Sequence, residues 1–239
     1  HAEVKELILP KYQKDDVAKD EDYFDDFIKI LEAYNSIPSN ERDNFRDHLV
    51  DINFILSVKN DGKELSLKNP SEVYLNNDEL QEFFKGHQSV YFVSDELFEK
   101  FGKEKVKKFL KDLGVEDKPR RIEVDGNLTW EEKRKLRGNS GYTEETYVKD
   151  YEYEGLENFI NNGITIEKSY LLWRLLLKNI EDLSSWQAKE FFDGKYRWFY
   201  YSSHERNFEA KFLKMLKNLL WIIDKNNEFT KPSDITFSE

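Results

Sequence analysis

The sequence contains no cysteine, which excludes disulfide bonds, thiolate metal sites and a cysteine nucleophile. Histidine is scarce as well, because His1, His48, His87 and His204 are the only four. No two of them have the close spacing of a metal-binding motif. We therefore expect histidines that are solvated or packed in a core, and we expect neither a bound metal nor another cofactor.

Long hydrophobic runs are missing too. The longest apolar stretch, 170–177, is interrupted by Arg174, and it is far shorter than the roughly 20 residues that a membrane span needs. No signal peptide opens the chain, so we expect a cytoplasmic protein without membrane contact. The only methionine is Met215, and we therefore expect the sequence to begin inside a longer protein.

Glycine is sparse and scattered, which argues against a phosphate-binding loop. Of the ten glycines, only Gly138 and Gly141 lie close together, and they follow a helical pattern instead of joining a strand to a helix. Glu123 and Asp125 near Lys133 have neither the order nor the spacing of a metal nuclease. The sequence thus predicts no catalytic residue, and a hydrolase with carboxylates and a histidine in one cleft stays a third alternative.

What the chain does have is aromatic and aliphatic residues in periodic patterns. Aromatic residues make up 15% of the sequence, enough to bury a core. Segment 23–35 repeats apolar residues at helical spacing, and 54–58 is a strand pattern closed by the turn Asn60-Asp61-Gly62. We predict an α+β fold, predominantly helical, with short strands and hairpins.

Local start and stop signals divide the chain. We predict a first helix-plus-hairpin subdomain at 1–115, a linker at 116–128 and a second helical subdomain at 129–239. Thr129 with Glu132, and Ser202 with Glu205, are predicted capping boxes for two helices of the second subdomain. Its helix from Thr165, apolar on nearly all sides, is predicted to lie at the centre of the core.

Two distant segments repeat one pattern. Segment 45–61 aligns without gaps on 212–228, and after a five-residue deletion Pro70-Ser71 matches Pro232-Ser233. The shared unit is predicted as a helix, a strand, a tight turn and a second strand that the Pro-Ser pair opens. Because the second copy reaches only Glu239, we expect the repeats to continue in the parent protein.

The charge distribution gives one candidate surface. The net charge of −11 argues against non-specific duplex binding, but segment 100–137 is net basic. Segment 195–201 alternates cations with rings, which fits either stacking platforms for single-stranded nucleic acid or a strand with its rings in the core. The plainer interpretation of segment 100–137 is a solvated helix face, and that of segment 195–201 is a strand with its rings in the core. The cations of the candidate partner or nucleic-acid surface are Lys103, Lys107, Lys108, Lys111, Arg120, Arg121, Lys195 and Arg197.

Several stretches resemble the region that follows the Hsp90/histidine-kinase-type (GHKL) ATPase domain in large sacsin-like and NO VEIN-like proteins. They are Leu9-Pro10-Lys11-Tyr12, Pro70-Ser71-Glu72-Val73-Tyr74-Leu75, 91–115, Gly155-Leu156-Glu157-Asn158-Phe159, Ser169-Tyr170-Leu171-Leu172-Trp173, and Trp221-Ile222-Ile223-Asp224 with Pro232-Ser233-Asp234-Ile235. The resemblance covers nearly the whole chain, and its motifs are packing and turn motifs. It implies an ATPase domain before this segment and further domains after it, but no nucleotide-binding motif lies in this chain.

Together these observations predict a non-catalytic middle or scaffold segment of a bacterial-type, ATPase-containing multidomain protein. Its expected work is to relay motion or to bind a partner, either other domains of the parent chain or a protein client. The alternative is a nucleic-acid-binding accessory domain that uses the basic 100–137 segment and the 195–201 strand.

Overall fold

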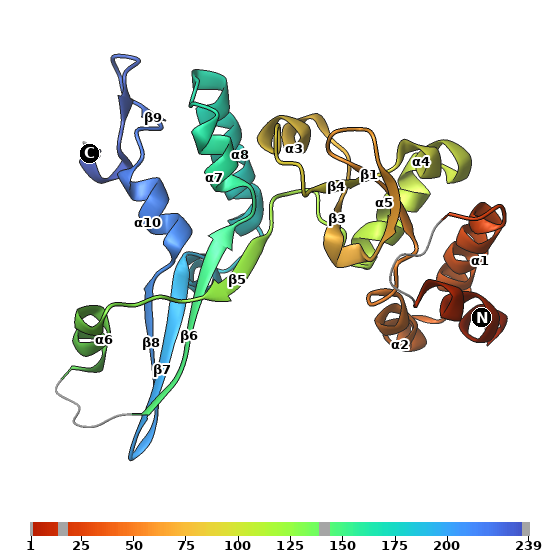
Figure 1. The fold of residues 1–239 in the computed structure, drawn as a ribbon, viewed down its shortest axis with the longest axis horizontal. Helices are drawn as coiled ribbons and strands as arrows, with labels where there is room; N and C mark the ends of the chain where they lie inside the picture. Colours follow the sequence, from red (N-terminus) through yellow and green to blue (C-terminus); the bar gives the residue numbers. More distant parts are fainter. Residues whose placement is uncertain (1, 14–18, 139–143, 236–239) are drawn as a thin grey trace. The chain divides into compact units, whose positions relative to one another are not determined.

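The computed structural model describes residues 2–13, 19–138 and 144–235. The chain divides into two compact units, His1–Asp117 and Lys118–Glu239. Each unit combines helices with small sheets, so the fold class is α+β, as the sequence predicts. Figure 1 shows the elements of both units along the chain.

The first unit packs helices around a four-stranded sheet. The sheet has the strand order β2-β1-β4-β3, in which β3 and β4 are parallel and the other pairs antiparallel. Its elements are η1 (Val4–Ile8), η2 (Leu9–Tyr12), α1 (Tyr23–Ser36), α2 (Ser39–Leu49), β1 (Ile55–Lys59), β2 (Leu65–Lys68), η3 (Pro70–Glu72), β3 (Val73–Tyr74), α3 (Asp78–Phe83), β4 (Tyr91–Val93), α4 (Asp95–Phe101) and α5 (Lys103–Asp112).

Aromatic rings build the core of this unit. The ring of Phe27 on α1 stacks on those of Phe54 and Phe101 at centroid distances of 6.1 and 5.4 Å, and Phe109 of α5 meets it edge-on. Tyr23 is fully buried, and its hydroxyl donates to the carbonyl of Phe54. The apolar face predicted for segment 23–35 is therefore the face that holds α1 to the sheet.

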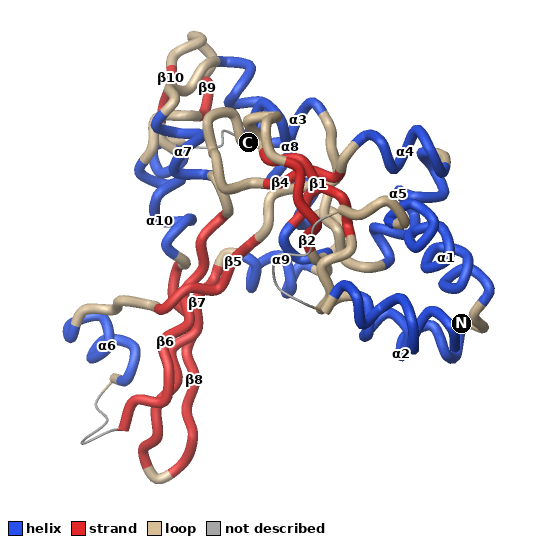
Figure 2. The backbone as a smooth tube through the Cα atoms, turned by 45° about the vertical axis from the view of Figure 1, so that its right-hand side comes forward, coloured by secondary structure: helices blue, strands red, loops and turns tan. Residues whose placement is uncertain are grey.

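The second unit is built on an antiparallel sheet with the strand order β5-β6-β7-β8. Figure 2 shows its three long strands, β6 to β8, side by side, with α7, α8 and α10 gathered near one end of them. Its elements are β5 (Arg121–Asp125), α6 (Trp130–Arg137), β6 (Glu144–Tyr153), α7 (Leu156–Asn161), α8 (Ile166–Ile180), α9 (Ser185–Phe191), β7 (Asp193–Tyr200), β8 (Ser202–Glu209), α10 (Lys211–Asn218), β9 (Ile222–Ile223), β10 (Phe229–Thr230) and η4 (Pro232–Asp234).

One face of this sheet carries an aromatic stack. Tyr196 and Trp198 of β7 are buried, and their rings stack at 5.1 Å. Arg137 of α6 lies over the ring of Tyr196 and donates to its hydroxyl, while Leu128 completes the small cluster. Strand alternation therefore places these rings in a core and leaves Arg197 exposed.

The structure differs from the sequence-based expectations at three places. Most of the expected linker 116–128 belongs to the second unit, because residues Arg121–Asp125 pair with β6 as an edge strand. The predicted capping box of Ser202 and Glu205 is wrong, since both residues lie in β8, paired along its length with β7. The sequence predicts no strand at Glu144–Tyr153, where the structure has β6. The expected loop 139–143 lies outside the described residues.

The helix expected after Ser202 begins instead at Lys211, and its cap comes from another strand. Asp150 of β6 is buried, and its Oδ1 accepts from the backbone N–H of Lys211 at 2.7 Å. The residue before α10 is Ala210, which offers no side-chain acceptor. A carboxylate at this end also opposes the positive end of the helix dipole.

Candidate partner-binding surface

Helix α8 is the longest helix of the second unit, and its ends are set by local signals. The side chain of Thr165 accepts from the backbone N–H of Lys168 and caps its first turn, as predicted. One side of the helix is buried through Leu171, Leu172 and Leu175, together with Leu176. Asn179 near its end donates to the hydroxyl of Tyr153 at 2.8 Å, which ties α8 to β6.

The opposite side of α8 is apolar and exposed to solvent. Four large side chains recur there at spacings of four, three and four residues, so they form one stripe along the helix. Their exposed fractions lie between two fifths and three fifths: Ile166 43%, Tyr170 57%, Trp173 41% and Leu177 50%. We call these four residues the α8 seam. The expectation that α8 is central to the core is thus correct for one side of the helix only.

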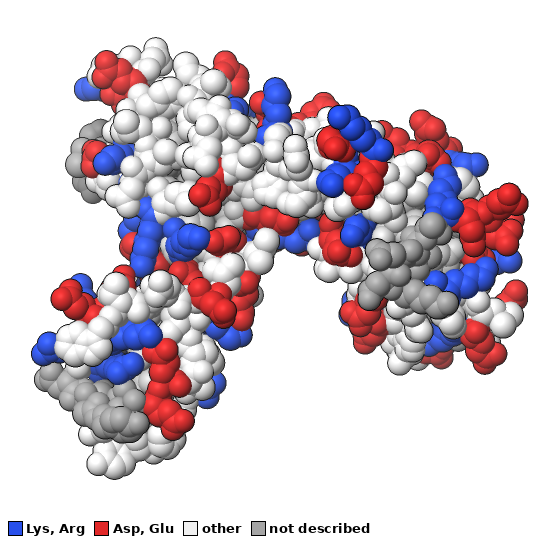
Figure 3. All heavy atoms as spheres, in the orientation of Figure 1, with Lys and Arg blue, Asp and Glu red and all other residues white. Residues whose placement is uncertain are grey.

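The seam contacts the start of the neighbouring hairpin through Trp173. The ring of Trp173 lies 4.9 Å from that of Trp221, which is itself buried and donates from Nε1 to the carbonyl of Leu216 at 3.0 Å. Next to it, Leu220 is 53% exposed. Figure 3 shows few charged atoms on the face above α7, α8 and β9. Of three tryptophans in this unit, Trp221 is buried, whereas Trp173 and Trp186 are exposed.

Charged residues border the α8 seam on one flank. Glu167, Arg174 and Glu181 are exposed and recur every seven residues, which places them on the same side of the stripe. The other flank holds buried Ser169 and Leu176. A surface with an apolar centre and charges along one edge has the composition of a docking site for another amphipathic element.

The cations predicted as a partner or nucleic-acid surface are divided between the two units. Lys103, Lys107, Lys108 and Lys111 lie on α5 of the first unit, where the buried side of the helix consists of Val106, Phe109 and Leu110. Lys111 forms an ion pair with Asp117 at 2.6 Å. These lysines therefore occupy the solvated side of an amphipathic helix.

The two arginines of the expected linker have structural contacts in the second unit. Arg120 lies 4.0 Å from Glu154. Arg121 is half-buried, donates to the carbonyl of Asp193 at 2.7 Å and lies 3.2 Å from the ring centroid of Tyr151. Burial lowers the pKa of the Arg121 guanidinium, and the contact with Tyr151 offsets part of that effect. Arg121 thus joins β5 to the start of β7.

The remaining two cations lie on the outward face of β7. Lys195 pairs with Glu190 at 3.3 Å, and Arg197 donates from Nε to the hydroxyl of Ser203 at 2.7 Å. Beside them on β6, Lys149 pairs with Glu123 at 2.9 Å. Cations with neighbouring carboxylates have less charge to offer a phosphate backbone.

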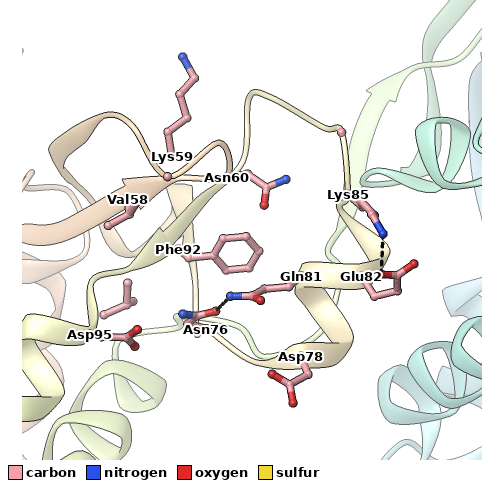
Figure 4. A pocket seen from close by; sticks show the side chains of 13 residues that line it. Val58, Lys59, Asn60, Asn76, Asp78, Gln81, Glu82, Lys85, Phe92 and Asp95 are labelled. Carbon is pink, nitrogen blue, oxygen red and sulfur yellow. Dashed lines mark hydrogen bonds and ion pairs between the residues drawn. The ribbon is translucent and has the colours of Figure 1, made fainter.

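A separate hollow of about 510 Å³ lies in the first unit, between the end of β1 and α3 (Figure 4). Phe92 and Val58 line it together with amides and charged groups. Several of these polar groups have partners in the protein: Gln81 donates to Asn76 at 2.7 Å, and Asn60 donates to the carbonyl of Phe84 at 2.6 Å. The volume of the hollow is in the range of small-molecule pockets, but its lining residues do not indicate which ligand would bind.

Within residues 2–13, 19–138 and 144–235, no three His, Asp or Glu side chains are grouped as metal ligands. In the same ranges, no helix has both the length and the apolar character that a membrane crossing requires. Comparisons of the chain with protein-family models, with curated proteins and with solved structures found no match. The α8 seam is therefore the candidate site that the geometry itself provides.

Proposed function

We propose that this chain is a non-catalytic scaffold segment that binds a protein partner through the α8 seam. The observation that carries the proposal is the seam itself, in which four half-exposed apolar side chains lie on one side of a helix whose other side is buried. Leaving such a stripe in water is unfavourable, by about 25 cal/mol for each Å² of apolar surface. Contiguous exposed apolar patches on folded proteins mark interaction sites.

The parent protein is proposed to be a cytoplasmic, sacsin-like or NO VEIN-like protein with a GHKL ATPase domain. This part of the proposal rests on the resemblance of the sequence segments alone. In the structure, the matching residues Leu9, Tyr12, Val73 and Leu172 are buried, which agrees with their role as packing motifs. In such a parent, a partner-binding segment would relay motion from the ATPase domain or hold a client.

The internal repeat is likewise a proposal, and the order of elements supports it. The first copy runs through α2, β1, β2 and η3, and the second through α10, β9, β10 and η4. Both hairpins are antiparallel, and both 3₁₀ turns begin at a Pro-Ser pair. The copies differ beyond the hairpin, since β1 also pairs with β4, whereas among the described residues β9 pairs with β10 alone. Such a repeat would make the parent a predominantly helical array of helix-hairpin units.

The proposal is tested by placing a photo-crosslinking amino acid at Leu177 in the full-length parent protein, in the cells that produce it. Leu65 is the matched control, because it is an equally exposed leucine on β2, at 54% against 50%. We expect position 177, and not position 65, to crosslink to one defined peptide that mass spectrometry identifies. The further change Tyr170→Glu is expected to abolish this crosslink.

Two results would overturn the proposal. One is the lack of any crosslink specific to position 177. The other is saturable ATP binding to the 239-residue chain by calorimetry, which would contradict its non-catalytic role. Binding of a single-stranded oligonucleotide that weakens steeply with added salt would favour the nucleic-acid alternative, because phosphate contacts release counterions.

A further inference from the structure

We infer that the partner of the α8 seam is a second copy of this chain, with the two α8 helices packed antiparallel about a two-fold axis near Tyr170. This inference rests on the proposed function and names the occupant of the same surface. Three features of the helix support it: the spacing of the seam, the charges along its flank and the area that it exposes.

The spacing of the seam is that of a helix-helix contact. Apolar residues separated by four, three and four positions occupy alternating a and d positions of a heptad. This pattern keeps the stripe facing a second helix that crosses at about 20°. From Ile166 to Leu177 the stripe is about 17 Å long, which is three turns of helix. The occupant with matching geometry is therefore another amphipathic helix.

The charged flank makes an antiparallel pair of α8 helices self-complementary. In an antiparallel pair, the flanks of the same type face each other, so the flank with Glu167 and Arg174 of one copy faces the same flank of the other. A two-fold axis near Tyr170 places Glu167 of each copy against Arg174 of the other, and the pair occurs twice. In a parallel pair this flank would face the position of Ser169 and Leu176, which are buried and offer no charge.

The exposed area sets the strength of the dimer. Large apolar side chains that are half exposed contribute roughly 100 Å² each, so the four seam residues expose roughly 400 Å² per copy. Two copies would bury about 800 Å², which is the low end of the range of interface sizes and fits a transient contact. We therefore expect a weak, reversible dimer with a Kd on the order of 10 to 100 μM.

Sedimentation velocity of the purified 239-residue chain, from about 2 to 300 μM, tests this inference. We expect the weight-average mass to rise from that of a monomer toward that of a dimer. Tyr170→Glu brings two carboxylates together at the axis and is expected to raise Kd at least about 100-fold. Leu65→Glu, an equally exposed leucine elsewhere, should leave Kd unchanged. The far-UV circular dichroism of each variant must match that of the parent chain.

A charge exchange tests the antiparallel register. Glu167→Arg and Arg174→Glu are each expected to raise Kd about 3- to 10-fold, and the double variant is expected to recover the original value. A double variant no better than the single ones refutes the register. A chain that stays monomeric at 300 μM, or a dimer that Tyr170→Glu leaves intact, refutes the inference as a whole. The proposed function survives that result if position 177 still crosslinks to a different protein, and fails if it does not.

Discussion

The cap of α10 gives a test of how the second unit is held together. Asp150 lies on β6, yet its Oδ1 accepts from the N–H of Lys211, the first residue of a helix that begins 61 residues later. Replacement by alanine removes this acceptor and leaves a part-buried helix N–H without its partner. Replacement by asparagine keeps an oxygen in the same place and removes only the charge.

The magnitudes follow from the physics of helix capping. Loss of a side-chain cap costs about 0.5 to 2 kcal/mol, and an unpaired buried donor adds to that cost. For Asp150→Ala we therefore expect the free energy of unfolding to fall by about 2 kcal/mol. For Asp150→Asn we expect a loss of about 0.5 kcal/mol, because asparagine caps nearly as well as aspartate and forfeits only the charge at the helix end. With a urea dependence of about 2 kcal/mol per M, the alanine variant should shift the midpoint by about 1 M.

Tryptophan fluorescence measures this loss directly. All five tryptophans lie after Lys118, so their emission reports the second unit, and buried Trp221 bonds to the last turn of α10. Asp182→Ala, which removes an exposed carboxylate, is the control. Its free energy of unfolding should stay within about 0.5 kcal/mol of that of the parent chain. If the alanine variant is as stable as the parent, or if asparagine is as damaging as alanine, the cap does not hold α10 in this way.

Two further predictions concern single side chains. The hydroxyl of Tyr23 donates to the carbonyl of Phe54 and accepts from the N–H of Leu56, both at 2.9 Å. Tyr23→Phe leaves two buried backbone groups unpaired, so we expect the free energy of unfolding to fall by about 2 kcal/mol. The amide hydrogens of α1 should then exchange roughly 30-fold faster. Unchanged exchange would show that the two hydrogen bonds of the Tyr23 hydroxyl add no stability. Hydrogen bonds from Thr129 lower the pKa of Glu132 from its ordinary 4.5. The unfolded chain therefore takes up this proton first as pH falls, so the stability from Glu132 is complete above about pH 5 and is lost below it. The urea midpoints of the parent chain and of Glu132→Gln should accordingly converge as the pH falls from 6 to 3. A difference that stays constant with pH would contradict a lowered pKa of Glu132.

The elements that the sequence predicts well are those encoded within a few residues. The helix predicted from Thr165 is capped by that side chain, and the predicted capping box of Thr129 with Glu132 is complete. Each of these signals depends on residues at most three positions apart. Local sequence therefore suffices for them, whatever the rest of the chain does.

The errors occur where distant pairing overrides the local signal. Ser202 and Glu205 have the spacing of a capping box, but the backbone of 202–209 bonds to β7 along its whole length. Strand β6 bonds to both β5 and β7, and its many charged residues conceal a strand whose partners lie 24 to 55 positions away. The acceptor for the N–H of Lys211 likewise comes from β6, and no pattern near residue 211 indicates it.

The α8 seam could have been found in the sequence, but only by counting two stripes on one helix. A helix that is apolar on nearly all sides fits the centre of a core, and that interpretation holds for the side of Leu172 and Leu175. The remaining apolar positions have a coiled-coil spacing of their own. They are bordered by Glu167 and Arg174, charges that a central helix would have to bury at high cost. Two apolar stripes with charge between them on one flank indicate a helix with two partners: the core of its own unit on one side, and on the other a second helix.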